Sequence, residues 1–78
     1  MGNICTLSCL RRDQRARVTD IAVSGSMRRR LQDIGLVRGT EVECVARGIF
    51  NDPAAYLVRG TLIAVRSEEA DLIEVETQ

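Results

Sequence analysis

The clearest hydrophobic pattern in the chain is a short amphipathic segment, residues 24–36. Its apolar positions recur at the spacing that places side chains on one face of a helix, and they are Met27, Leu31 and Ile34. Ser24 or Ser26 is expected to cap the start of this helix with its side-chain oxygen. Gly35 is expected to end it in a left-handed conformation, with Leu36 folding back onto the last turn. Because a helix of about two or three turns is unstable alone, its apolar face must pack on the rest of the chain.

Most of the remaining chain alternates apolar and polar residues with the period that is typical of strands. The predicted strands span residues 15–23, 41–49, 54–58, 61–65 and 71–76. The first of them changes phase after Val18, which predicts a β-bulge near Asp20. A single helical turn is expected just before the last strand, with Ser67 as its cap. About five short strands, with one short helix inserted after the first long strand, predict a mostly β fold in the form of a small antiparallel barrel or sandwich.

Two local signals refine this prediction. The sequence Val-Arg-Gly-Thr occurs at residues 37–40 and again at 58–61, each time at a predicted turn that needs a glycine. Leu7 and Leu10 lie in an apolar lead-in before the first long strand, and we expect them to dock on the barrel. No linker or change in composition divides the chain, so we expect a single domain over residues 1–78.

Charge and cysteine content narrow the class of protein. The 11 basic residues, all of them arginine, balance 11 acidic residues, which argues against a general nucleic-acid-binding protein. No apolar stretch is long enough to span a membrane, so no direct membrane insertion is expected. The 3 cysteines are odd in number and lack the spacing of a disulfide framework, which favours a reduced, cytoplasmic setting.

The chain offers little catalytic or metal-binding chemistry. It contains no histidine, the commonest general base and metal ligand, and no glycine-rich motif that cradles a phosphate. Cys5 and Cys9 could share one face, but two thiols leave a tetrahedral zinc site incomplete. Cys44 alternates with polar neighbours and is expected in the core. We therefore predict neither an enzyme nor an intrinsic metal or cofactor site.

The most informative polar feature is the run Arg28, Arg29 and Arg30 on the predicted helix. Asp33 is expected to pair with Arg29 or Arg30 at helical spacing. A solvated helix face explains this run as well as a function does, because the stems of arginine also cover apolar surface. The functional interpretation is a docking face for an acidic or phosphate-bearing partner, since arginine forms bidentate pairs with carboxylates and phosphates.

The order of motifs resembles that of the ferrous iron transport protein A (FeoA) family over almost the whole chain. The most specific stretch is Leu31-x-x-Ile34-Gly35-Leu36-x-x-Gly39-Thr40-x-Val42. The supporting motifs are Thr6-Leu7-Ser8-x-Leu10, Val58-x-Gly60, Ile63-Ala64-Val65-Arg66 and Glu69-Ala70-x-x-Ile73-x-Val75. The chain departs from the family pattern at Asp13 and Arg38, where members often carry Gly and Pro.

The resemblance implies an SH3-like β-barrel with a helix inserted after the first long strand. It also implies a small cytoplasmic accessory protein of bacterial ferrous iron uptake that acts on the FeoB permease of the inner membrane. A related domain is an interaction module in some metal-responsive transcription regulators. The association of the family with Fe(II) transfers no ligand set to this chain, which has no histidine.

We therefore expect a binding module that docks on the cytoplasmic side of FeoB and biases its transport or GTPase cycle. The candidate contact residues are Arg28, Arg29, Arg30, Gln32, Leu36 and Arg38. Two alternatives remain open. One is a small-barrel nucleic-acid-binding module, which the neutral charge and the scarcity of aromatic residues disfavour. The other is an Fe(II) carrier to the permease. An unpaired barrel edge could also support weak self-association.

Overall fold

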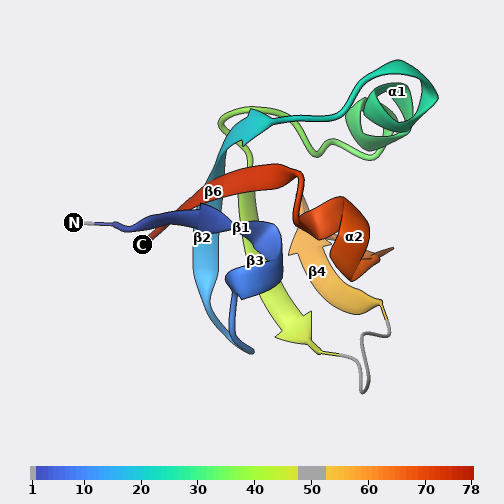
Figure 1. The fold of residues 1–78 in the computed structure, drawn as a ribbon. Helices are drawn as coiled ribbons and strands as arrows, with labels where there is room; N and C mark the ends of the chain where they lie inside the picture. Colours follow the sequence, from blue (N-terminus) through green and yellow to red (C-terminus); the bar gives the residue numbers. More distant parts are fainter. Residues whose placement is uncertain (1, 48–52) are drawn as a thin grey trace.

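The computed structural model describes residues 2–47 and 53–78 of the chain. Within these two ranges, six strands form one antiparallel sheet in the order β1-β6-β2-β3-β4-β5 (Figure 1). The strands are β1 (Ile4–Thr6), β2 (Arg15–Ile21), β3 (Glu41–Ala46), β4 (Ala54–Val58), β5 (Thr61–Val65) and β6 (Ile73–Thr77). The helices are the 3-10 helix η1 (Leu7–Cys9) and the α-helices α1 (Gly25–Asp33) and α2 (Ser67–Ala70). The predicted mostly β fold, with a helix after the first long strand, is confirmed.

The sheet contains one strand more than the sequence pattern predicted. This strand is β1, within the apolar lead-in, and it pairs with β6 so that Cys5 lies opposite Val75. Its three residues are too few to show a clear alternation, and its partner strand lies at the far end of the chain. A strand of this kind is stabilised by its neighbour rather than by its own pattern.

The boundaries of three predicted strands differ from those observed. The last strand, predicted over residues 71–76, is observed as β6 (Ile73–Thr77), because residues 71 and 72 form a turn after α2. The bulge is confirmed, because the register of β2 against β6 shifts between Val18 and Asp20. However, β2 ends at Ile21 rather than at residue 23. The predicted strand 41–49 is observed as β3 up to Ala46, and its residues 48 and 49 lie outside the described residues.

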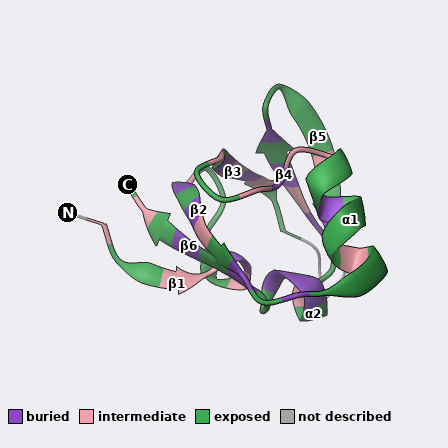
Figure 2. Cartoon of the chain, turned by 90° about the horizontal axis from the view of Figure 1, so that it is seen from above, coloured by how far each residue is buried: buried purple, intermediate pink, exposed green. Residues whose placement is uncertain are grey.

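One apolar core lies on the inner face of the curved sheet, beneath α2 and η1 and the buried side of α1 (Figure 2). Leu7 and Leu10 are fully buried, as predicted, and so is Cys44. The inward positions of the strands supply most of the remaining core, namely Ala16, Val18, Ile21, Val42, Ala54, Tyr56, Val58, Val65, Ile73 and Val75.

The end of α1 follows the sequence prediction closely. Gly35 has a φ of +89°, in the left-handed region. The N–H of Leu36 donates to the carbonyl of Leu31 at 2.9 Å, and the N–H of Gly35 donates to the carbonyl of Gln32 at 3.0 Å. These two bonds form a Schellman motif, in which the apolar residue after the glycine packs back onto the helix.

The predicted starts of both helices were wrong in detail. Ser24 occupies the cap position of α1 with an extended backbone, but its hydroxyl makes no capping hydrogen bond. The chain passes from Ser24 into the helix through Gly25 at a φ of +68°, so the hydroxyl does not approach the first free N–H groups as it does in a standard cap. At α2 the cap position is Arg66 rather than Ser67, and the carboxylate of Glu69 accepts a hydrogen bond from the N–H of Arg66 at 3.4 Å.

Candidate functional site

The turn between α1 and β3 is held in place by hydrogen bonds to β2 and to the end of the helix. The N–H of Gly39 donates to the carbonyl of Val18 at 2.7 Å, and the N–H of Val18 donates to the carbonyl of Thr40 at 2.9 Å. The hydroxyl of Thr40 donates to the carbonyl of Gly35 at 3.0 Å. This turn is therefore a fixed platform for the side chains that project from it, rather than a free loop.

A small hollow, which we call the helix groove, lies between α1 and this turn. Its volume is about 240 Å³, and it is lined by Ile21, Arg28, Gln32, Val37 and Arg38. The structure thus brings together three of the residues predicted as partner contacts, from the helix and from the turn. No carboxylate is among the described residues that line it, so the two arginines stand beside an apolar floor.

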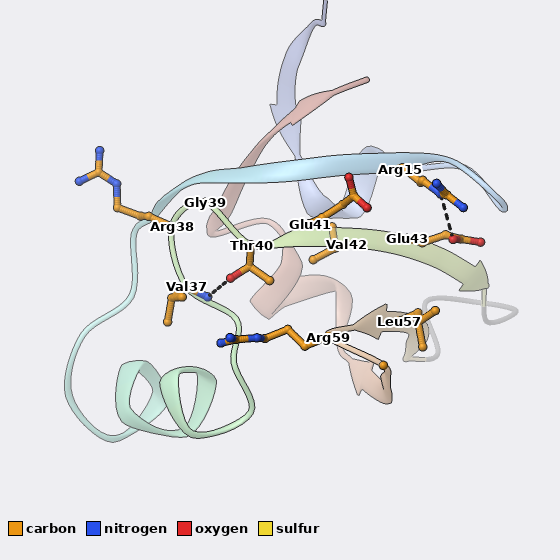
Figure 3. A pocket seen from close by; sticks show the side chains of 11 residues that line it. Arg15, Val37, Arg38, Gly39, Thr40, Glu41, Val42, Glu43, Leu57 and Arg59 are labelled. Atoms are coloured by element: carbon orange, nitrogen blue, oxygen red, sulfur yellow. Dashed lines mark hydrogen bonds and ion pairs between the residues drawn. The ribbon is translucent and has the colours of Figure 1, made fainter.

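Arg38 is oriented by the backbone of the neighbouring strand. Its Nε donates to the carbonyl of Thr19 at 3.1 Å. The other nitrogens of the guanidinium extend outward, away from the molecule (Figure 3). A guanidinium held by one bond to its own chain retains most of its donors for a carboxylate or phosphate.

Arg30 does not belong to this groove. Its guanidinium forms an ion pair with the carboxylate of Glu69 at 2.5 Å, which joins α1 to α2. The predicted pairing of the arginine run with Asp33 was therefore wrong, because the only ion pairs among the described residues are this one and Arg15–Glu43. Arg29 is exposed. It lines neither the helix groove nor the small hollow beside the Arg30–Glu69 ion pair.

Leu36 must be removed from the set of candidate contacts. Its side chain is fully buried in the core, because the Schellman motif turns it back against Leu31. The same local rule that predicted the fold-back therefore excludes Leu36 from the surface.

A second and larger hollow, the strand groove, is lined by this turn, by the neighbouring strands β2, β3 and β4, and by the β4–β5 turn (Figure 3). Its volume is about 670 Å³, and Val37 and Arg38 line it as well as the helix groove. It contains two arginines that sequence reasoning did not select, Arg15 and Arg59. The available signal was the repeated Val-Arg-Gly-Thr, since the arginines of the two copies, Arg38 and Arg59, both line this groove.

The strand groove contains carboxylates, those of Glu41 and Glu43, as well as arginines. Arg15 pairs with Glu43 at 3.2 Å. The carboxylate of Glu41 accepts a hydrogen bond from the side-chain amide of Gln78 at 2.8 Å. Arg59 lies toward the turn, with its stem against Gly35 (Figure 3). We therefore regard the smaller helix groove, whose described lining residues include no carboxylate, as the better candidate for binding an acidic partner.

The thiols do not form a metal-binding group in the structure. Among residues 2–47 and 53–78, no three side chains of His, Cys, Asp or Glu are arranged to hold a metal ion. Burial raises the pKa of the Cys5 and Cys44 thiols, whereas a hydrogen bond from Thr6 lowers the pKa of exposed Cys9. In the same residue ranges, no helix is both long and apolar enough to cross a membrane.

Comparison with known proteins identifies close structural relatives. A family model described as the FeoA domain matches residues 5–77. The solution structure of FeoA from Chlorobium tepidum is 38% identical with a TM-score of 0.86, over 92% of this chain and 69% of that chain. Iron(II) transport protein A from Clostridium thermocellum is also 38% identical, with a TM-score of 0.88, over 92% of this chain and 44% of that chain.

A third relative connects the family with the SH3 fold. FeoA from Stenotrophomonas maltophilia, crystallised with zinc and described as a prokaryotic SH3 domain protein, is 35% identical with a TM-score of 0.73, over 90% of this chain and 87% of that chain. A manganese-dependent transcriptional repressor, at 19% identity and a TM-score of 0.87, shows a shared fold alone. A comparison with curated protein sequences gave no match.

Proposed function

This chain belongs to the FeoA family, and from that membership we propose that it assists ferrous iron transport by docking on the FeoB permease through the helix groove. The observation that carries the proposal is the composition of the groove. Two arginines from different elements, Arg28 and Arg38, flank an apolar floor with no carboxylate among the described lining residues. The groove suits an Asp- or Glu-bearing segment on the cytoplasmic side of the permease.

The proposed mechanism is a shift in the population of permease states. A docked module biases a conformational equilibrium only if it binds one state more tightly than the other. The fixed turn supports this mechanism, because a rigid surface distinguishes two shapes of a partner better than a loop that adapts to both. We expect the nucleotide state of the GTPase domain to decide which shape is presented.

The test measures binding of the purified chain to detergent-solubilised FeoB, and to its isolated GTPase domain, with and without nucleotide. Arg28→Glu and Arg38→Glu are each expected to weaken binding about tenfold or more, because each removes a charge-assisted hydrogen bond and adds repulsion. Arg29→Glu, on the same helix but outside the groove, is expected to have a smaller effect.

Arg12→Glu serves as the matched control. Arg12 is exposed in the turn before β2, and Figure 1 places the start of β2 at the opposite end of the sheet from α1. Its substitution changes the net charge by the same amount but should leave binding unchanged. Undiminished binding of folded Arg28→Glu and Arg38→Glu proteins would refute the helix groove. Absence of binding to both FeoB preparations would refute docking and leave the family assignment intact.

A further inference from the structure

The β5 strand forms an exposed edge of the sheet. Within residues 2–47 and 53–78, it lies at one end of the strand order and pairs only with β4. Its five residues include no charged residue and no proline, and Leu62 is 60% exposed. The opposite edge, β1, has only three residues. Natural proteins blunt exposed edges with short strands, charges or proline, and β5 has none of these protections.

The backbone of β5 has hydrogen-bonding groups that point away from the sheet. Arg59 and Gly60 have φ values of +52° and +82°, so β4 and β5 are joined by a two-residue turn of type I′. Such a turn makes Val58 and Thr61 a hydrogen-bonded pair. Pairs alternate along an antiparallel ladder, so the N–H and C=O groups of Leu62 and Ala64 point to the free side. Among the described residues, the N–H and C=O groups of Leu62 and Ala64 make no backbone hydrogen bond to a turn or loop.

The outer face of the hairpin is apolar as well. Leu57 lies opposite Leu62, and Ala55 lies opposite Ala64. Figure 2 shows β5 mostly in the colour of exposed residues, with a single buried position. An uninterrupted apolar run is the pattern of a strand that is covered on both faces, yet Leu62 and Ala64, on one face of β5, are exposed.

We propose that β5 pairs antiparallel with β5 of a second copy of this chain, about a two-fold axis at Ile63. This register makes Leu62 of each copy the hydrogen-bonding partner of Ala64 of the other, so the outward groups of both strands are satisfied. A two-fold axis at Leu62 or at Ala64 would instead require pairing by the turn residue Gly60 or by Arg66, which precedes α2. The register at Ile63 uses strand residues alone.

Charge favours a second copy as the partner. The strand carries no charge that would select a charged segment, and it is complementary to itself in the proposed register. The chain has a net charge of zero, so two copies approach without overall repulsion. An interface of two short strands is small, and the dimer is therefore weak and depends on concentration. The proposal does not depend on the FeoB proposal, because no residue of β5 lines the helix groove.

Sedimentation equilibrium of the full chain over a range of concentrations tests the proposal. The wild-type chain dimerises as concentration rises, and the backbone amides of Leu62 and Ala64 become protected from hydrogen exchange. Leu62→Lys raises the dimer dissociation constant about tenfold or more, because like charges approach across the two-fold axis. Ala64→Pro has the same effect, because it removes an outward N–H while leaving the pairing with β4 intact.

Ile4→Lys is the matched control. Ile4 is an aliphatic residue of the other edge strand with a similar exposure, 57%. Its substitution leaves dimerisation unchanged. A wild-type chain that stays monomeric at every concentration overturns the proposal. So does a dimer that is insensitive to Leu62→Lys and Ala64→Pro, or one that protects the amides of β1 instead of those of β5.

Discussion

At the scale of single residues, Tyr56 shows how burial determines chemistry. It is the only tyrosine of the chain, and its side chain is 1% exposed. Its hydroxyl donates to the carbonyl of Leu7 at 3.3 Å, which ties η1 to the inner face of β4. Burial raises the pKa of Tyr56 to about 12, because the charged phenolate is poorly solvated in the core.

We expect this residue to make the folded state sensitive to alkaline pH. The hydroxyl ionises near pH 10 in the unfolded chain but only near 12 in the folded chain. The contribution of neutral Tyr56 to the free energy of unfolding is therefore fully present below pH 10 and is lost as pH rises toward 12. The expected loss in the free energy of unfolding is about 2–3 kcal/mol, measured by urea denaturation across this range.

Tyr56→Phe is the comparison that isolates the effect. It removes the ionisable hydroxyl and keeps the ring in the core. We expect the Phe variant to lose about 0.5–1.5 kcal/mol at neutral pH, with its hydrogen bond to Leu7, but to be less sensitive between pH 10 and 12. Cysteine ionisation remains in both proteins. Equal pH dependence of the two would show that Tyr56 is not responsible.

At the scale of elements, the end of α1 and the β4–β5 hairpin depend on each other. A Cβ atom on Gly35 would lie 2.9 Å from Cδ of Arg59, so a side chain there would displace the stem of Arg59 in addition to adopting a φ of +89°. Gly39 has nearly the same φ, +88°, with open space around it. Substitutions at these two glycines therefore separate two effects. Both test the cost of a side chain at positive φ, and only Gly35 also tests the contact with Arg59.

We predict that Gly35→Ala destabilises the chain more than Gly39→Ala. Each variant places a side chain in the left-handed region, at a cost of about 1–2 kcal/mol. Only Gly35→Ala also displaces the stem of Arg59. Urea denaturation of both variants, repeated in an Arg59→Ala background, measures the difference. The extra loss should disappear when Arg59 is absent, and its persistence would argue against the contact.

Elements also show how far local patterns extend. The Schellman motif at Gly35 and the bulge near Asp20 were both predictable, because each depends on residues close together in sequence. The strand β1 was not, because Thr6 pairs with Glu74 near the far end of the chain. The predicted serine caps were wrong for a related reason. The backbone path into each helix decides whether a serine hydroxyl reaches the first free N–H groups, and that path depends on the elements that it joins.

At the scale of the whole molecule, the two proposed surfaces differ in charge. The helix groove presents arginines, whereas β5 is uncharged. We predict that added salt weakens binding to FeoB, because screening reduces attraction between exposed charges. Salt should not weaken self-association, which depends on backbone hydrogen bonds and apolar contact. Binding assays and sedimentation at low and high salt provide the measurement. Parallel weakening of both would contradict the assignment of distinct surfaces.

The sequence by itself determined the fold class, most of the strands, the helix with its glycine end, and many of the side chains that enter the core. These features follow from short-range periodicity and from backbone conformations that only glycine adopts easily. The family membership rests on the same local motifs. For the candidate site, the sequence indicated the arginine run and Arg38 but not their separate roles.

Only the tertiary structure decided those roles. It directs Arg30 to Glu69, 39 residues away, and leaves Arg28 beside Arg38 at the helix groove. It also brings Arg59 against Gly35 and leaves β5 at an open edge. The physical reason is that a local pattern specifies which face of an element is apolar, whereas the partner of a long charged side chain depends on which distant segments the fold brings together.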